Sequence, residues 1–155
     1  MSDDGFADYP KTVVLKDGGH VILRPLGAAE GAVLRALLAR VAPAERLVPG
    51  AIIVAWDGER AVAAAALERC MPEVARLSVA IDPEYRGQRL GTWLVLDGVH
   101  LAAGVGVERL EATAHPGDAA YLAALERLDF VVDAARTSPS SVVLMKRLHR
   151  GWTDF

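Results

Sequence analysis

The stretch of sequence that decides the fold runs from residue 79 to residue 92 and reads VAIDPEYRGQRLGT. Its first part is apolar and stops at Asp82-Pro83, which is typical of the end of a β-strand. A short loop with Gly87 follows, and helical spacing begins near Leu90. The first turn of a helix leaves backbone N–H groups without acceptors, and the helix dipole favours an anion there. The stretch therefore predicts a strand, a loop and a helix that together form an anion site.

The residue types of this loop favour a phosphate ligand. Gly87 and Gly91 lack side chains and allow the backbone to approach a ligand closely. Arg86 and Arg89 can add charge-assisted hydrogen bonds to phosphate oxygens. The anion that these features fit best is a pyrophosphate. The alternative is a tight strand-to-helix turn with solvated arginines, and the loop alone does not decide between the two.

Hydrophobic periodicity places further strands and helices on both sides of this stretch. Asp17-Gly18-Gly19 predicts a hairpin turn between the first two strands. The alanine-rich segment 61–69 is expected to be a strand although alanine prefers a helix. The expected strands cover residues 11–15, 20–24, 51–56, 61–69, 74–81, 109–114, 130–133 and 141–148, and the expected helices cover 28–42, 90–105 and 117–128.

The order of these elements mixes hairpins with β-α-β units. The expected fold class is therefore α/β, or α+β, with a mixed sheet and helices on both of its faces. A purely parallel nucleotide-binding sheet fits badly, because three strands between residues 51 and 81 follow one another through short turns. We expect a polar N-terminal tail over residues 1–10 and a single domain over residues 11–155.

Composition and charge narrow the classes of function. The 155 residues are 52% hydrophobic and 24% charged, which is a globular composition. The net charge of −3 disfavours nonspecific binding to nucleic acid or to a membrane surface, because both need a basic excess. The longest apolar run, residues 61–67, is far shorter than the roughly 20 residues of a membrane span.

The N-terminal residues, the cysteine count and the arginine content bear on the cellular location and the source of the protein. The acidic opening, Met1 to Gly5, is unlike a signal peptide, and the single cysteine, Cys70, gives no sign of an oxidising compartment. We therefore expect a cytoplasmic protein and interpret Cys70 as a small buried residue. The excess of arginine over lysine suggests a GC-rich bacterial genome. The oligomeric state, monomer or homodimer, is left open.

Three segments resemble the GNAT (GCN5-related) N-acetyltransferase family. The family signature is Arg or Gln, two residues, Gly, one residue, then Gly or Ala, and residues 86–91 match it except at Arg89, where glycine is usual. Residues 118–130 look like the segment in which an asparagine, a helix and Gly-Phe follow one another, with Asp118 in place of the asparagine and Asp129 in place of the glycine. Residues 15–26 look like the opening of bacterial protein-lysine acetyltransferase domains of this family.

The resemblance covers residues 11 to about 148 and implies an acyl-CoA N-acyltransferase fold. In that fold a mostly antiparallel sheet of about seven strands splays between the family's fourth and fifth strands. These correspond to residues 74–81 and 109–114 here, the fifth and sixth of the strands given above. Acetyl-CoA, as co-substrate, is implied to bind in the splay without any metal. Its binding residues are implied to be Val79, Ala80, Ile81, Arg86, Gly87, Gln88, Arg89, Leu90, Gly91, Thr92 and Asp118.

Arg89 is the clearest departure from the family pattern. If the backbone angle φ is negative at this position, the arginine fits and adds a positive charge. If φ is positive, the residue costs about 1 kcal/mol or more. We expect the arginine to be accommodated.

The catalytic residues are less clearly marked. The tyrosine that GNAT enzymes often carry seven residues after the asparagine is replaced by Leu125, but Tyr121 lies one turn earlier on the same helix face as Asp118. Tyr121 is therefore the candidate acid. The alternative is that Tyr121 has only a structural role, as a core residue whose hydroxyl lies at the rim. The glutamate that serves as base in related lysine acetyltransferases is replaced by Arg76. The candidate bases are Glu73 and His115, and then Glu68 and Glu111.

The resemblance implies an N-acetyltransferase that moves the acetyl group of acetyl-CoA to a primary amine, on a protein lysine or a small molecule. Because the usual tyrosine and glutamate are missing, an acetyl-CoA-binding sensor or partner-binding module is the alternative. A longer acyl donor is a third hypothesis. No pair of histidines has metal-ligand spacing, and His100 with Asp97 is interpreted as a helix-surface pair.

Overall fold

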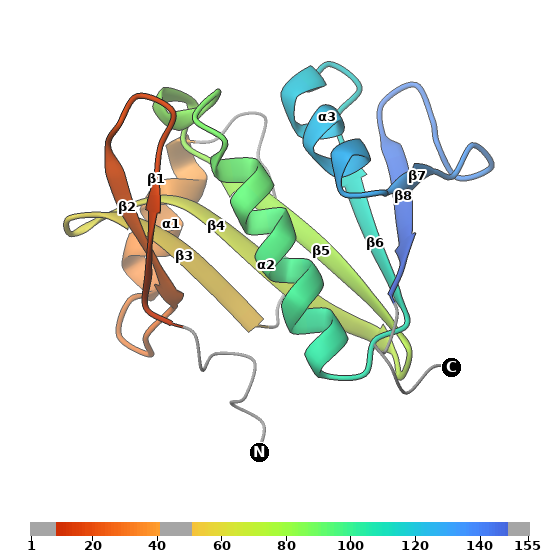
Figure 1. Ribbon diagram of the computed structural model, residues 1–155, viewed down its shortest axis with the longest axis horizontal. Helices are drawn as coiled ribbons and strands as arrows, with labels where there is room; N and C mark the ends of the chain where they lie inside the picture. The colour runs from red at the N-terminus through yellow and green to blue at the C-terminus, as the bar shows by residue number, and fades with distance from the viewer. Residues whose placement is uncertain (1–8, 41–50, 149–155) are drawn as a thin grey trace.

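The computed structural model describes residues 9–40 and 51–148 of the chain. Its centre is one eight-stranded sheet with the strand order β1-β2-β3-β4-β5-β6-β8-β7 (Figure 1). The strands are β1 (Lys11–Val14), β2 (His20–Pro25), β3 (Ala51–Asp57), β4 (Arg60–Met71), β5 (Val74–Ile81), β6 (Arg109–Ala114), β7 (Val131–Val132) and β8 (Val142–Arg147). The helices are α1 (Gly31–Arg40), α2 (Leu90–Gly104) and α3 (Ala119–Arg127), with a short 3₁₀ turn, η2, at Pro83–Tyr85.

The expected fold class and the expected order of strands and helices along the chain are confirmed. Every neighbouring pair in the sheet is antiparallel except β5 and β6, which run parallel. The sheet has the eight strands that periodicity predicts, one more than the about seven that the resemblance implies. The strand expected over residues 130–133 is only the two-residue β7, which pairs with Met145 and Leu144 of β8 at one edge. The segment over 61–69 is a strand as expected, and it extends to Met71. The end of the expected first helix, residues 41–42, lies outside the described residues.

Helices cover both faces of the sheet. In Figure 1, α2 crosses in front of the sheet and α1 lies behind it. Side chains of neighbouring residues in a strand point to opposite faces. In β3, Ile53 therefore packs in the core on the α2 side, whereas Val54 packs with Leu37 of α1.

The alanines of β4 let both helices lie close to the sheet. Ala63 and Ala65 are buried on the α2 side, and Ala64 is buried on the α1 side. Burial on both faces outweighs the intrinsic helix preference of alanine, which explains why this segment is a strand. The approach of α2 is equally close, because a Cβ atom on Gly98 would lie 2.6 Å from Leu77 Cδ1.

The sheet splays between its two parallel strands. β5 and β6 pair only from Val74 with Arg109 to Leu77 with Ala112. β5 itself continues to Ile81 and stays paired with β4. The next N–H group, that of Asp82, donates to Val62 of β4 at 2.8 Å. Because the N–H and C=O groups of successive residues in a strand point to alternate sides, those of Val79 and Ile81 point into the splay.

Two side chains outside the splay differ from their expected environments. Asp97 is buried in the middle of α2 and is not part of a surface pair with His100. Its carboxylate accepts hydrogen bonds from Tyr9 Oη at 2.7 Å and Lys11 Nζ at 2.6 Å, so the start of the described chain is fixed on α2. Cys70, expected to be buried, is exposed near the end of β4.

Candidate functional site

The loop between β5 and α2 is anchored by a buried carboxylate. Asp82 is only 2% exposed, and its Oδ1 accepts from the N–H of Glu84 at 3.0 Å. Its Oδ2 accepts from Arg40 Nε at 2.8 Å and Arg60 Nη2 at 3.1 Å. Burial by itself would raise the pKa of Asp82, but these donors outweigh it and lower the pKa below its usual value. Asp82 is therefore ionised and joins the start of the loop to α1 and β4.

The loop takes the left-handed conformation at two positions before α2 begins. Gly87 has φ of +78° and Arg89 has φ of +68°. The sequence-based prediction that Arg89 fits the loop without strain is therefore wrong, because an L-residue in this region costs about 1–2 kcal/mol. The loop nevertheless keeps the course that glycine would allow, and Arg89 stands at the N-terminal cap of α2 without capping it through its side chain.

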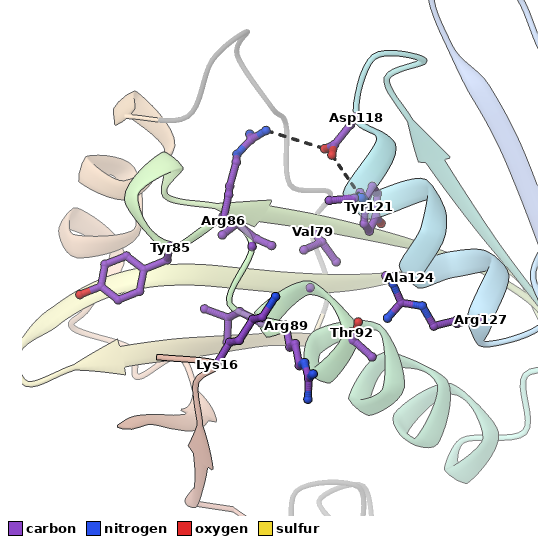
Figure 2. Close-up of a pocket in the computed structure, with 15 residues that line it drawn as sticks. Lys16, Val79, Tyr85, Arg86, Arg89, Thr92, Asp118, Tyr121, Ala124 and Arg127 are labelled. Atoms are coloured by element: carbon purple, nitrogen blue, oxygen red, sulfur yellow. Dashed lines mark hydrogen bonds and ion pairs between the residues drawn. The ribbon is translucent and has the colours of Figure 1, made fainter. Parts of the chain in front are cut away.

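A cavity of about 320 Å³ opens at this loop, between the splay, the start of α2 and the face of α3 (Figure 2). The cavity is lined by Lys16, Val79, Ile81, Tyr85, Arg86, Gly87, Arg89, Leu90, Gly91, Thr92, Asp118, Ala120, Tyr121, Ala124 and Arg127. The structure thus brings together nine of the eleven residues that the resemblance assigns to acetyl-CoA, and it places Tyr121 beside them.

The other two residues of that set face elsewhere. Ala80 packs on the opposite face of the sheet, in the cluster around Leu37, and strand alternation directs its main-chain groups to β4. Gln88 turns away from the cavity, and its Oε1 accepts from the N–H of Asp17 at 3.0 Å. Only the main chain of Gln88 remains on the path of the loop.

Asp118 connects α3 to the loop on the other side of the cavity. As the N-terminal cap of α3, its Oδ1 accepts from the N–H of Tyr121 at 3.2 Å. Its Oδ2 lies 3.9 Å from Nη1 of Arg86. Figure 2 shows this contact spanning the gap between the loop and α3. The two walls of the cavity are therefore linked by one ion pair.

The candidate bases lie outside the cavity. Glu73 is exposed at the start of β5, roughly 20 Å along the strand from Val79. His115 follows β6 at the same end of the sheet as the cavity, but it is exposed and its Nδ1 accepts from the N–H of Gly117 at 3.0 Å. Glu68 is half-buried in β4, and its Oε1 lies 3.9 Å from Nη1 of Arg76 on β5.

Glu111 is committed to a different interaction. Its carboxylate is 7% exposed and accepts two hydrogen bonds from Arg136, at 2.8 and 3.1 Å. The bonds from Arg136 lower the pKa of Glu111 despite its burial. A carboxylate held ionised in this way is a weak proton acceptor, so Glu111 is a poor candidate for the base.

Two cations of the cavity were missed by reasoning from the sequence. Lys16 comes from the turn of the β1–β2 hairpin, and Arg127 comes from the last turn of α3. Arg127 could have been found, because Ala120, Ala124 and Arg127 lie at i, i+4 and i+7 and so share one helix face. Lys16 carried no such signal, since its place depends on how the hairpin packs against the loop.

The charges of the cavity suit a ligand with several phosphates. Lys16, Arg86, Arg89 and Arg127 line it, and Asp118 supplies the single carboxylate among the described lining residues. The free N–H groups of the first turn of α2 add to this positive potential. Within residues 9–40 and 51–148, no group of three or more His, Cys, Asp or Glu side chains could hold a metal ion. None of the helices in this part of the chain is long and apolar enough to cross a membrane.

Solved structures share this fold. The GNAT domain of Streptomyces lividans PAT superposes with a TM-score of 0.79 at 16% identity, covering 92% of this chain and 98% of that one. YncA of Salmonella typhimurium, solved with its cofactor acetyl-CoA, has a TM-score of 0.66 at 15% identity, covering 85% and 96%. A Bacillus subtilis acetyltransferase in complex with CoA has a TM-score of 0.66 at 16% identity, covering 83% and 99%.

Identities this low establish the fold, and the sequence itself establishes the family. The family model for GNAT acetyltransferases matches residues 25–130, which include the splay, the loop and α3. A search of curated protein sequences finds no match. With the family signature, the splayed sheet and the cationic cavity at one place, the chain belongs to the GNAT family of acetyltransferases.

Proposed function

We propose that this protein transfers the acetyl group of acetyl-CoA to a primary amine by direct attack of the amine on the thioester. The observation that carries the proposal is the continuity of the cavity, which runs from the splayed edge of β5 to the free amides at the start of α2. One end offers main-chain hydrogen bonds to an extended arm, and the other offers charge to phosphates. Acetyl-CoA has both chemical features, in this order.

The splayed edge of β5 suits the pantetheine arm. The N–H and C=O groups of Val79 and Ile81 point into the splay, where β6 has moved away. The two amides of the arm can pair there as an added strand would. Farther along, the amides of residues 87–92 and the Arg86 guanidinium can bind the pyrophosphate.

This binding mode brings the thioester to the inner end of the splay. There the amine nitrogen forms a bond to the carbonyl carbon, the C–S bond breaks, and the sulfur leaves with the electron pair. A main-chain N–H of the splay, such as that of Val79, can stabilise the negative charge on the carbonyl oxygen. Alignment of the two reactants contributes up to about 7–11 kcal/mol in ideal cases.

Two protons must move, and the chain offers one group in the cavity for this task. Tyr121 lines the cavity beside Val79 and is our proposed donor to the departing sulfur. The amine must lose a proton before or during attack. His115 stands at the end of the sheet where the cavity opens, and it is the remaining candidate base. Glu73, at the far end of β5, is not retained for this role.

The specific observation that favours a second function is that few groups in the cavity could act as a general base for the amine. Asp118 is the one carboxylate among the described lining residues, and it is bonded to the N–H of Tyr121 and close to Arg86. A protein with this site could bind acetyl-CoA without efficient transfer, as a sensor or a partner-binding module. Tyr121 in the cavity favours the enzyme.

A turnover assay separates the two functions. The protein is incubated with acetyl-CoA labelled in the acetyl group and with a panel of amines and lysine-containing peptides, and labelled product and free thiol are measured. Transfer to at least one amine, with equal amounts of thiol and acetylated product, supports the enzyme. Tight binding by calorimetry without transfer to any member of the panel supports the sensor.

A further inference from the structure

Lys16 enters the cavity from a hairpin turn whose backbone is fixed by several hydrogen bonds. The N–H of Gly18 donates to the carbonyl of Leu15 at 3.0 Å, and the N–H of Leu15 donates to the carbonyl of Gly19 at 2.7 Å. The Asp17 carboxylate accepts from the N–H of Gly19 at 2.9 Å. Gly18, with φ of +92°, allows the tight turn. Lys16 therefore starts from a defined backbone position although its side chain is exposed.

The side chain of Gln88 joins this hairpin to the loop of the cavity. Gln88 belongs to the loop, and its Oε1 accepts from the N–H of Asp17, the residue after Lys16, at 3.0 Å. The two residues are 71 positions apart in sequence, so the bond is a tertiary contact. Gln88 thus faces away from the cavity yet holds the hairpin that supplies one of its cations.

Lys16 and Arg89 are available for a ligand. Within the part of the chain that the structure describes, neither has a carboxylate at ion-pair distance, whereas Arg86 lies 3.9 Å from Asp118. Two unneutralised cations at one end of a cavity attract an anion there. Figure 2 shows both on the side of the cavity away from Asp118 and Tyr121.

The order of groups along the ligand decides which anion reaches this end. If the thioester lies near Tyr121 and the pyrophosphate lies on the amides of residues 87–92, the part of CoA that continues past the loop is the ribose with its 3′-phosphate. We propose that Lys16 binds the 3′-phosphate of CoA and that Gln88 is its positioning residue. This inference rests on the proposed binding of acetyl-CoA.

The test compares CoA with 3′-dephospho-CoA by calorimetry at low ionic strength. The unmodified protein should prefer CoA by about tenfold, the scale of one charge-assisted contact at an exposed site. In Lys16→Gln most of this preference should vanish while the affinity for 3′-dephospho-CoA stays the same. Gln88→Met, which keeps the size of the side chain and removes the oxygen acceptor, should lose part of the preference with Lys16 still present.

Two control variants make the result specific. Arg35→Gln removes an exposed positive charge on α1, on the opposite face of the sheet, and should keep the full preference. Arg147→Gln removes an exposed positive charge at the end of β8, where this strand pairs with the start of β6 and away from the cavity, and should also keep it. Equal binding of CoA and 3′-dephospho-CoA by the unmodified protein would overturn the inference but leave the proposed acetyl-CoA binding intact. A preference for CoA that survives Lys16→Gln would have the same meaning. Binding of neither ligand would overturn the proposed function as well.

Discussion

Arg89 and Asp129 adopt the same left-handed backbone conformation, with φ of +68° and +70°. They are the two non-glycine residues with positive φ in the described part of the chain, and each ends or begins a helix of the site. Asparagine and aspartate tolerate this region better than arginine does. The strain is therefore unequal, although the geometry is nearly the same.

Replacing these residues by glycine should raise stability by different amounts. Arg89→Gly should increase the free energy of unfolding by about 1 kcal/mol, because relief of the left-handed strain exceeds the added flexibility of the unfolded chain. Asp129→Gly should give a smaller gain. Chemical denaturation of both variants measures the difference. A loss of stability in Arg89→Gly would show that the side chain stabilises the fold in some other way.

Although the backbone conformation of Arg89 lowers stability, its charge should strengthen ligand binding. Arg89→Ala should weaken acetyl-CoA binding by about 1–3 kcal/mol, the range for a hydrogen bond to a charged group. The loss should shrink at high salt, because screening already weakens the contact in the unmodified protein. Calorimetry at two ionic strengths checks both statements. Binding as tight as that of the unmodified protein would mean that Arg89 only occupies the turn.

Gly91 should tolerate no large side chain. It lines the cavity in the first turn of α2, and a Cβ atom there would already lie 3.2 Å from Ile81 Cδ1. Gly91→Trp should abolish acetyl-CoA binding by filling the space beside the free amides, while circular dichroism reports whether the fold persists. Gly104, at the other end of α2, has open space around it, and Gly104→Ala serves as a control. Unchanged affinity in a folded Gly91→Trp protein would place the ligand elsewhere.

Tyr121→Phe should separate chemistry from binding. The substitution keeps the ring that packs against the core and removes only the hydroxyl. A thiol with a pKa near 8–9 needs limited help as a leaving group, so kcat should fall by about 10²- to 10⁴-fold at most. Acetyl-CoA affinity should hold, and the alkaline limb of the pH–rate profile should move. An unchanged kcat would remove Tyr121 from the mechanism and leave the sulfur to take its proton from water or from the substrate.

The ion pair between Glu111 and Arg136 should make the free energy of unfolding depend on pH in the acid range. Arg136 lowers the pKa of Glu111 below its ordinary value of 4.5, so the folded state binds this proton less readily than the unfolded state does. The stabilisation is therefore present above pH 4.5 and is lost as the pH falls through the folded pKa. Arg136→Ala should lower the free energy of unfolding at neutral pH, since it leaves the buried carboxylate of Glu111 poorly paired.

Denaturation from pH 7 to pH 3 tests this ion pair. The difference in unfolding free energy between the unmodified protein and Arg136→Ala should narrow toward the acid end. A difference that stays constant over this range would assign the effect of Arg136 to packing in the loop before β8. Lys146→Ala, whose nearest carboxylate is the exposed Asp129 at 4.0 Å, is the matched control and should show little pH dependence.

The sequence by itself determined the order of the elements and the place of the anion-binding loop. Short-range signals carry this information: β-branched runs, the Asp17-Gly18-Gly19 turn, Asp82-Pro83 at a strand end, and the apolar spacing from Leu90 onward. The resemblance showed that glycine is usual where Arg89 and Asp129 stand, but it did not predict the sign of φ at either position. The expectation that Arg89 is accommodated without strain was wrong, because both residues have positive φ in the structure.

Only the tertiary structure decided which side chains share the cavity. Alternation along β5 directs Val79 and Ile81 to the splay and turns Ala80 to α1, while a hydrogen bond to the hairpin turns Gln88 outward. Glu73 and Val79 lie in one segment, yet the length of the strand separates them by roughly 20 Å. Lys16 reaches the cavity through a contact between residues 71 positions apart. Such contacts depend on how elements pack, and local spacing in a sequence carries no record of that packing.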